Sequence, residues 1–247
     1  MLKTKTKGDG MELYDAIIRR TREYLSAYSP RRYPYDAKKC WKETASGEMI
    51  LLRDAAYELG GGNCESVNYT CATSDQELLI ENEILLYGED LPELRQDTSF
   101  ARIVFIRTDA ADNFEGEEEL YRFVRELEYV RYHIFPKGYM VRTSAKSSRE
   151  QARVSKDAIG AGINFERLGS TYIRKYLKNP RVRNVQVLFL TGMKELEPFL
   201  KEAQQTDAVT GALNHILQGM PMNCKTCDLK TICDEVDGMR SLHQKNR

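Results

Sequence analysis

Short apolar runs alternate with amphipathic stretches after residue 100, and this alternation constrains the fold more than any other feature of the chain. The runs at 101–108, 137–145 and 182–192 have the length and composition of β-strands. The stretches between and after them have apolar residues at helical spacing, and we predict helices within 116–132, 147–158, 164–179, 194–205 and 208–219.

The first 100 residues add one helix and several candidate strands. Residues 11–28 place apolar side chains on one helical stripe, and two prolines in the next segment end that helix. We predict strands at 48–54, 66–73 and 83–89, the second of them half-buried because its apolar and polar residues alternate. Three consecutive glycines at 60–62 predict a turn with positive φ or a close approach of another segment.

These elements predict an α+β fold, with a mixed, largely antiparallel sheet, flanking helices and a short C-terminal cysteine-rich tail. No repeat and no proline- or glycine-rich linker divides the chain. We therefore expect an N-terminal helix with a flexible start at 1–32, an α+β domain at 33–219 and a cysteine-cluster tail at 220–247.

Charge and hydropathy exclude some classes of function. The 37 basic and 37 acidic residues give a net charge of zero, which argues against a general nucleic-acid or anionic-membrane binder. No apolar run is long enough to span a bilayer, and no apolar stretch follows the basic N-terminus as in a signal peptide. We expect a cytoplasmic protein.

Three of the six cysteines lie within ten residues of each other, at Cys224, Cys227 and Cys233. Disulfide frameworks belong to shorter, cysteine-denser secreted chains, so this C-x2-C-x5-C cluster predicts metal ligation by thiolates. Zinc and an iron–sulfur cluster both fit thiolates at this spacing. The remaining alternative is three free cysteines without a shared ligand.

A complete site of either kind normally has four protein ligands, and the tail supplies three cysteines. The fold can bring in an upstream cysteine, or the ligand can be His243 or a non-protein group, or the position can stay open. The upstream candidates for the fourth ligand are Cys40, Cys64 and Cys71.

Two segments of the chain resemble the central domain of acetyl-CoA synthase, the nickel–iron–sulfur subunit of the carbon monoxide dehydrogenase/acetyl-CoA synthase complex. The first contains an aromatic-Pro-aromatic stretch, a strand, an "ELGG" turn and another strand: "RYPYDAKKCWKETASGEMILLRDAAYELGGGNCESVNYT". The second is "RVSKDAIGAGINFERLGSTYIRKYLKNPRVRNVQVLFLTG". A helix and the cysteine cluster follow in the family's order, so the resemblance extends from about Tyr33 to about Asp234.

The resemblance implies an iron–sulfur-type cluster, with Cys224 and Cys227 matching the opening C-x-x-C of the family and Cys233 matching its third cluster cysteine. The gap before Cys233 is shorter than in the family, and the fourth cluster cysteine is missing. The Cys-Gly-Cys chelate that holds nickel has no counterpart, since the sequence contains no C-x-C. A square-planar nickel site needs those thiolates, so nickel is not expected on this chain alone.

The resemblance also implies that the central domain offers arginines to coenzyme A. Arginine suits its phosphates because the guanidinium fork binds phosphate oxygens bidentately. The candidates in this sequence are Arg142, Arg149, Arg153 and Arg174, with Arg181 and Arg183 as further possibilities. The motif "RVSKDA" is better explained as a helix start capped by Ser155 than as a phosphate cradle.

Three functional hypotheses follow. The first is an acetyl-CoA synthase-related accessory or partner-dependent protein of carbon monoxide and acetyl-CoA metabolism in anaerobic cells, inactive by itself as an acyltransferase. The second is a non-catalytic interaction module whose tail is held by zinc. The third is an acyltransferase subunit completed by a second polypeptide of the carbon monoxide dehydrogenase/acetyl-CoA synthase system, which brings the missing nickel ligands.

Overall fold

The computed structural model describes residues 12–45, 47, 49–50, 53–61, 64–109, 117–144 and 149–217. The helices are α1 (Glu12–Leu25), α2 (Glu117–Tyr132), α3 (Lys156–Gly160), α4 (Phe165–Tyr176) and α5 (Glu197–Leu217). The strands are β1 (Arg31–Pro34), β2 (Ala56–Leu59), β3 (Ser66–Thr73), β4 (Glu83–Tyr87), β5 (Phe100–Thr108), β6 (Tyr139–Ser144), β7 (Arg149–Ser155) and β8 (Val182–Thr191).

The described strands form two sheets. The larger is mixed, in the order β1-β4-β8-β5-β3, with parallel pairs β4–β8 and β3–β5. The smaller is antiparallel, in the order β2-β7-β6. Four of the six strand pairings within the described residues are antiparallel, which confirms the predicted α+β class with a mixed, largely antiparallel sheet.

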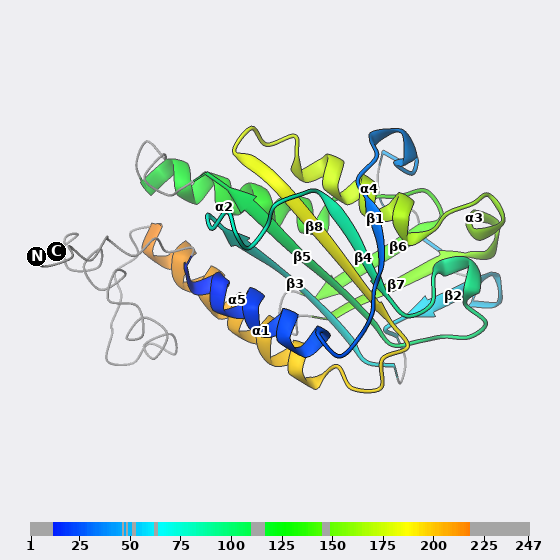
Figure 1. The fold of residues 1–247 in the computed structure, drawn as a ribbon. Helices are drawn as coiled ribbons and strands as arrows, with labels where there is room; N and C mark the ends of the chain where they lie inside the picture. Colours follow the sequence, from blue (N-terminus) through cyan, green and yellow to red (C-terminus); the bar gives the residue numbers. More distant parts are fainter. Residues whose placement is uncertain are drawn as a thin grey trace, which may run out of the picture.

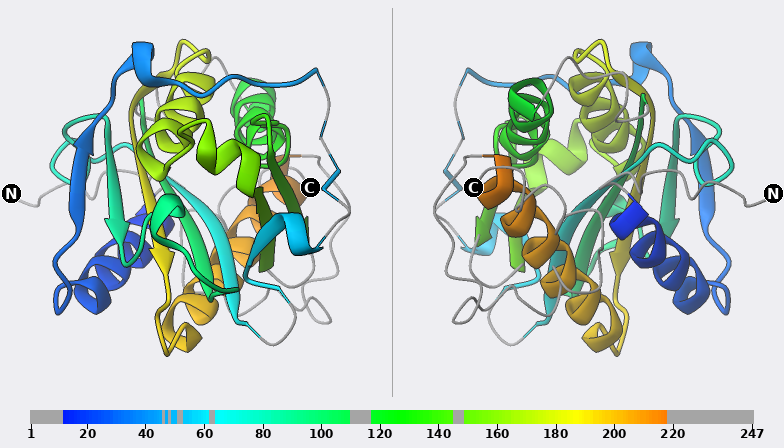
Figure 2. Two further views of the ribbon diagram at one scale, coloured as in Figure 1. Left: turned by 90° about the vertical axis from the view of Figure 1, so that its right-hand side faces the viewer. Right: turned by 90° about the vertical axis from the view of Figure 1, so that its left-hand side faces the viewer.

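Helices and the smaller sheet sandwich the five-stranded sheet (Figures 1 and 2). Helices α1 and α5 pack against β3 on one face, and they also pack against each other. Helix α4 packs against β4 and β8 on the other face, where β7 of the smaller sheet also contacts β3 and β5. None of the described helices combines the length and the apolar character that a membrane span requires.

Helix α4 shows how directly sequence periodicity sets the core. The predicted inward residues are all buried: Phe165, Leu168, Tyr172, Ile173 and Tyr176. The helix begins at the cap residue Asn164, whose side-chain oxygen accepts a hydrogen bond from the Arg167 amide at 2.9 Å. Its Gly169 lets α4 lie close to β4, since a Cβ there would sit 2.4 Å from Ile84 Cγ1. Periodicity, cap and glycine therefore all favour the same packing.

The structure corrects the prediction of a helix at 147–158. Residues 149–155 form β7, in which Glu150, Ala152 and Val154 are buried while the intervening side chains are more exposed. Burial of every second side chain is the period of a strand. In this segment it outweighs the weaker helical spacing on which the prediction was based. The helix begins only at Lys156, where the Ser155 hydroxyl accepts a hydrogen bond from the Ala158 amide, so the predicted cap is confirmed.

Two further corrections concern the first 60 residues. The segment predicted as a strand at 48–54 has its described part in coil and in a 3₁₀ turn, and the strand β2 lies just after it, at 56–59. Helix α1 ends at Leu25, before the two prolines as predicted, but the segment that follows also contains the unpredicted strand β1, which includes Pro34. Proline lacks an N–H donor, but it is tolerated because β1 is an edge strand paired on one side only.

Strand β3 is buried on both faces, whereas its alternating pattern predicted one exposed face. Tyr69 and Cys71 face α1 and α5, through hydrogen bonds to Thr21 and Thr206 respectively. Asn68 points to the opposite face and is also fully buried. The alternation therefore separates an apolar face from a buried polar face, and the polar partners come from distant parts of the chain.

Candidate functional site

Three of the four arginines predicted to contact phosphate lie on one face of the smaller sheet. Antiparallel pairing of β6 with β7 sets Arg142 opposite Gln151, which lies between Arg149 and Arg153 on β7. Alternate residues of a strand share a face, so the three arginines project from the same side. We call this surface the arginine face and define it as Arg142, Arg149 and Arg153.

Only one member of the arginine face is neutralised by a described residue. Arg153 forms an ion pair with Glu58 of β2 at 3.0 Å, and Gln151 donates a hydrogen bond to the same carboxylate. The side chains of Arg142 and Arg149 are exposed, and neither guanidinium has a hydrogen bond or an ion pair with a described residue. Two guanidinium groups on one sheet face, without an acidic partner among the described residues, are an arrangement suited to binding phosphate oxygens.

Arg174 lies apart from the arginine face. It belongs to α4, and its guanidinium forms an ion pair with Glu43 at 3.2 Å, next to Lys175, which binds the same carboxylate at 3.0 Å. Tyr172 of α4 lies against Arg102 of β5, which binds Glu150 on the inner side of the smaller sheet, while the arginine face is on the outer side. Arg174 is therefore already paired, on a different surface from the other three.

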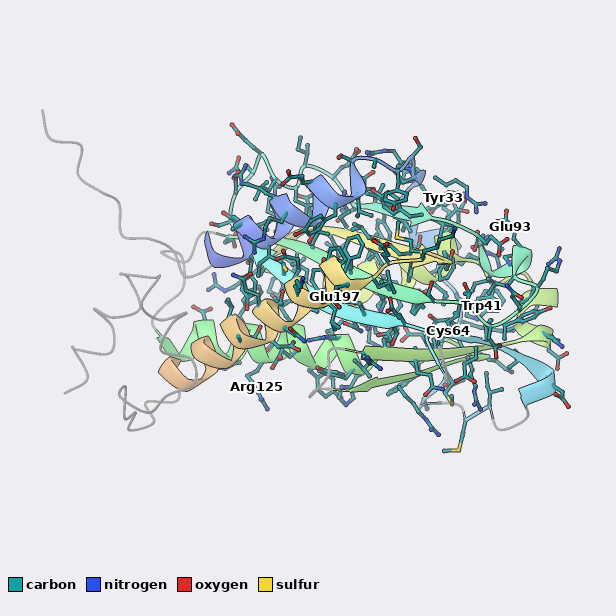
Figure 3. The ribbon with its side chains drawn as sticks, turned by 90° about the horizontal axis from the view of Figure 1, so that it is seen from below. Tyr33, Trp41, Cys64, Glu93, Arg125 and Glu197 are labelled. Atoms are coloured by element: carbon teal, nitrogen blue, oxygen red, sulfur yellow. The ribbon has the colours of Figure 1, made fainter. Side chains whose placement is uncertain are left out.

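The three upstream cysteines do not converge. Cys71 is fully buried on β3, with its sulfur 3.5 Å from Thr206 Oγ1 on α5. Cys40 is half-buried against α4, its thiol donating to the Ser170 carbonyl at 3.3 Å, on the opposite face of the large sheet. Cys64 is half-buried in the turn before β3 (Figure 3). Within the described ranges, no three His, Cys, Asp or Glu side chains group as a metal site.

The cysteine cluster Cys224, Cys227 and Cys233 and the alternative ligand His243 lie outside the described residues. The environments of the other thiols still bear on which of them suits a fourth position. Burial raises the pKa of Cys71 to about 12 and also raises the pKa of Cys40, and a metal ligand must be the thiolate. Cys71 is therefore the costliest fourth ligand among the upstream cysteines.

Cys64 is an unsuitable fourth ligand for a different reason: it lies near the beginning of α5, whereas the cysteine cluster follows the end of that helix in the sequence. The Glu65 carboxylate accepts a hydrogen bond from the Leu196 amide at 3.1 Å, so Cys64 lies beside the beginning of that helix. The 21 residues of α5 span about 30 Å. The seven residues from Leu217 to Cys224 reach at most about 25 Å when fully extended. Cys64 could join Cys224 only if this segment ran almost straight back along the whole helix.

A buried ion pair between the two sheets was missed by the sequence analysis. Arg102 on β5 and Glu150 on β7 are both fully buried, with Nη2 and Oε2 2.6 Å apart and Nε and Oε1 2.9 Å apart. The ring of Tyr172 lies 4.3 Å from the Arg102 guanidinium carbon. One signal was visible, since Arg102 is a charged residue inside an apolar run.

Further polar groups extend this pair toward two helices. Arg131 of α2 donates to Asn68 Oδ1 at 2.8 Å and to the Asn68 carbonyl at 2.6 Å, and it forms an ion pair with Asp207 of α5. The Asn68 amide in turn donates to Glu150. We call Asn68, Arg102, Arg131 and Glu150 the buried polar network. Through these contacts the network joins the two sheets to α2 and α5. Because its side chains are buried, it is not positioned to act on a dissolved substrate.

Comparison with known proteins gives no identification. No protein-family model and no curated protein sequence matches this chain. The function must therefore be inferred from the spacing of its cysteines, its described geometry and the resemblance in its sequence.

Proposed function

We propose that this chain is an acetyl-CoA synthase-related protein of carbon monoxide and acetyl-CoA metabolism, with an iron–sulfur-type cluster bound by Cys224, Cys227 and Cys233. The observation that supports this best is the contact between its two family-like segments. Strand β2, from the first segment, pairs with β7 of the second through Tyr57 opposite Val154 and Glu58 opposite Arg153. Two weak sequence signatures are more meaningful when they build one structural unit than when they lie apart.

A second contact joins the same two segments. The Trp41 amide donates to Thr171 Oγ1 on α4 at 2.8 Å, and the indole is almost completely buried. Its Nε1 donates to the Lys137 carbonyl at 2.8 Å. Trp41 therefore fixes the first segment against α4 and is not available to stack on a ligand.

The ligand set limits what this protein does by itself. Three thiolates leave one iron of a cubane-type cluster open to another ligand, while the absent C-x-C removes the chelate for nickel. We therefore propose an accessory role, or a role in which a partner of the carbon monoxide dehydrogenase/acetyl-CoA synthase system supplies the nickel site. Thiolate ligation is suited to the reducing cytoplasm, where we propose that the protein acts.

A zinc-bound tail in a non-catalytic interaction module is the second candidate. It is favoured by the unsuitable positions of the upstream thiols, because zinc accepts imidazole together with three thiolates and His243 follows the cluster. Iron–sulfur clusters are bound mainly by thiolates, so this alternative predicts that His243 is essential and that iron is absent.

Metal analysis of the full chain purified without oxygen tests both candidates. We expect brown protein containing iron and acid-labile sulfide, and loss of both when Cys224, Cys227 and Cys233 are all replaced by serine. Replacement of Cys71 by serine is the matched control, because that thiol is buried against α5 and should leave the iron content unchanged. Colourless protein with stoichiometric zinc that depends on His243 would support the interaction module instead.

Coenzyme A binding tests the arginine face separately from the metal. We expect the double replacement of Arg142 and Arg149 by glutamine to weaken coenzyme A binding by at least about 100-fold, since each charge-assisted hydrogen bond contributes about 1.5–3 kcal/mol and two are lost. Arg174→Gln is the control, because Arg174 is paired with Glu43 on another surface. Equal losses in both variants, measured by calorimetry, would contradict the assignment.

A further inference from the structure

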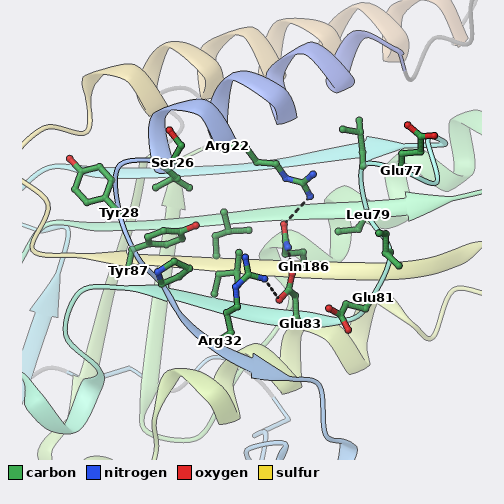
Figure 4. A pocket seen from close by; sticks show the side chains of 16 residues that line it. Arg22, Ser26, Tyr28, Arg32, Glu77, Leu79, Glu81, Glu83, Tyr87 and Gln186 are labelled. Atoms are coloured by element: carbon green, nitrogen blue, oxygen red, sulfur yellow. Dashed lines mark hydrogen bonds and ion pairs between the residues drawn. The ribbon is translucent and has the colours of Figure 1, made fainter.

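The α1 side of the five-stranded sheet is only partly covered by helices, and a groove of about 460 Å³ lies over the uncovered part (Figure 4). Helices α1 and α5 pack over β3, while side chains of β4 and β8 line the groove. The lining residues from these strands are Glu83, Leu85, Tyr87, Gln186 and Leu188. The volume is within the range of small-molecule sites, roughly 300–1,000 Å³.

Arg22 is a cation of this groove without an acidic partner among the residues that the structure describes. It lies in the last turn of α1, and its Nη2 donates to Gln186 Oε1 at the long distance of 3.3 Å. Partial burial lowers the pKa of Arg22 from its ordinary value, so a nearby anion would relieve an unfavourable charge. A guanidinium has five N–H donors, so this single long contact leaves Arg22 with donors to offer a ligand.

The other charges of the groove define what kind of anion fits. Glu83 is neutralised by Arg32 at 3.0 Å and also accepts a hydrogen bond from Gln186 Nε2 at 2.5 Å. Glu77 and Glu81 are exposed at the groove and form no ion pairs within the described ranges. Arg22 therefore matches a single negative charge, while Glu77 and Glu81 disfavour a dianion and attract a cationic group.

We propose that this groove binds a small zwitterion of the amino-acid type, with its carboxylate on Arg22 and its ammonium group facing Glu77 and Glu81. The carboxylate forms charge-assisted hydrogen bonds with the guanidinium fork. An adjoining hollow of about 580 Å³ shares Tyr28 and Tyr87 with the groove, so the site admits ligands longer than a single amino acid. None of the described residues that line the groove belongs to the arginine face.

Calorimetric titration of the full chain with 6-aminohexanoate, hexanoate, hexylamine and inorganic phosphate tests the charge pattern. We expect saturable binding that is tightest for 6-aminohexanoate, because it alone carries both a carboxylate for Arg22 and an ammonium group for Glu77 and Glu81. Arg22→Gln should weaken its binding by about 10-fold, the loss of one charge-assisted contact. Arg19→Gln is the matched control on the same helix, since Arg19 pairs with Asp75 and does not line the groove.

A second variant blocks the groove without touching its charge. Ser26 is exposed and lines the groove beside Arg22, so Ser26→Trp should abolish 6-aminohexanoate binding while the protein stays folded. The proposal is overturned if 6-aminohexanoate does not bind saturably, or if binding is unchanged in both Arg22→Gln and Ser26→Trp. Tighter binding of phosphate, hexanoate or hexylamine than of 6-aminohexanoate also overturns it.

Discussion

Replacing Glu150 with alanine should lower the free energy of unfolding by about 3–5 kcal/mol, because the substitution leaves the fully buried Arg102 charge without its counter-ion. The loss extends beyond the pair, since Glu150 also accepts from Asn68, which holds Arg131. Urea unfolding followed by circular dichroism measures this loss directly.

The matched double variant, Arg102→Met with Glu150→Leu, removes both charges. It therefore separates the cost of leaving one buried charge unpaired from the cost of losing the ion pair itself. Replacing both partners of a buried pair by apolar side chains is often neutral, so this protein should be more stable than Glu150→Ala alone. Arg19→Ala breaks an ion pair in which the arginine is exposed and should change stability little. A double variant no more stable than Glu150→Ala would contradict this account of the buried polar network.

Gly60→Ala should destabilise the protein by about 3 kcal/mol, the sum of a strained backbone and a steric clash. Gly60 has φ of 67°, and a Cβ there would sit 2.4 Å from Ser66 Cβ and 2.8 Å from the Glu150 carbonyl oxygen. The second of these neighbours is backbone, which cannot rotate away. Thermal and urea unfolding give the size of the effect.

Two other glycines act as controls, because they separate the cost of backbone strain from the cost of the steric clash. Gly162 has φ of 95° but open surroundings, so Gly162→Ala should show the backbone cost without the clash. Gly160 is within α3, and a Cβ added there would have nothing within 4 Å, so Gly160→Ala should stabilise the protein slightly. If Gly60→Ala lowers the free energy of unfolding no more than Gly162→Ala does, the steric clash is not what requires a glycine at position 60.

Local signals in the sequence predicted several parts of the fold correctly. Helix α4, the cap at Ser155 and the positive φ at Gly60 each depend on neighbours a few residues away. The strands β1 and β2 were missed or misplaced because their partners β4 and β7 lie far along the chain, and β7 was missed although its partner β6 directly precedes it. Their segments are short or charged, and local propensity is weak for such segments.

Among the candidate site residues too, some follow from local sequence and others depend on neighbours far along the chain. That Arg142, Arg149 and Arg153 share a face follows from strand geometry, but it required recognising β7 as a strand. Arg22 was not predicted, since its neighbour Gln186 is 164 residues away. The metal ligands Cys224, Cys227 and Cys233 were inferred from spacing alone and stay a prediction, because they lie outside the described residues.

The pairing of α1 with α5 has a consequence for how the chain acquires its structure during synthesis. Tyr14 bonds to Thr210 and Arg20 to Glu202, contacts separated by 196 and 182 residues respectively. Such distant contacts close late and slow folding, because a long loop must be ordered first. Helix α1 therefore leaves the ribosome long before α5 is made, with its apolar side exposed to chaperones in the interval.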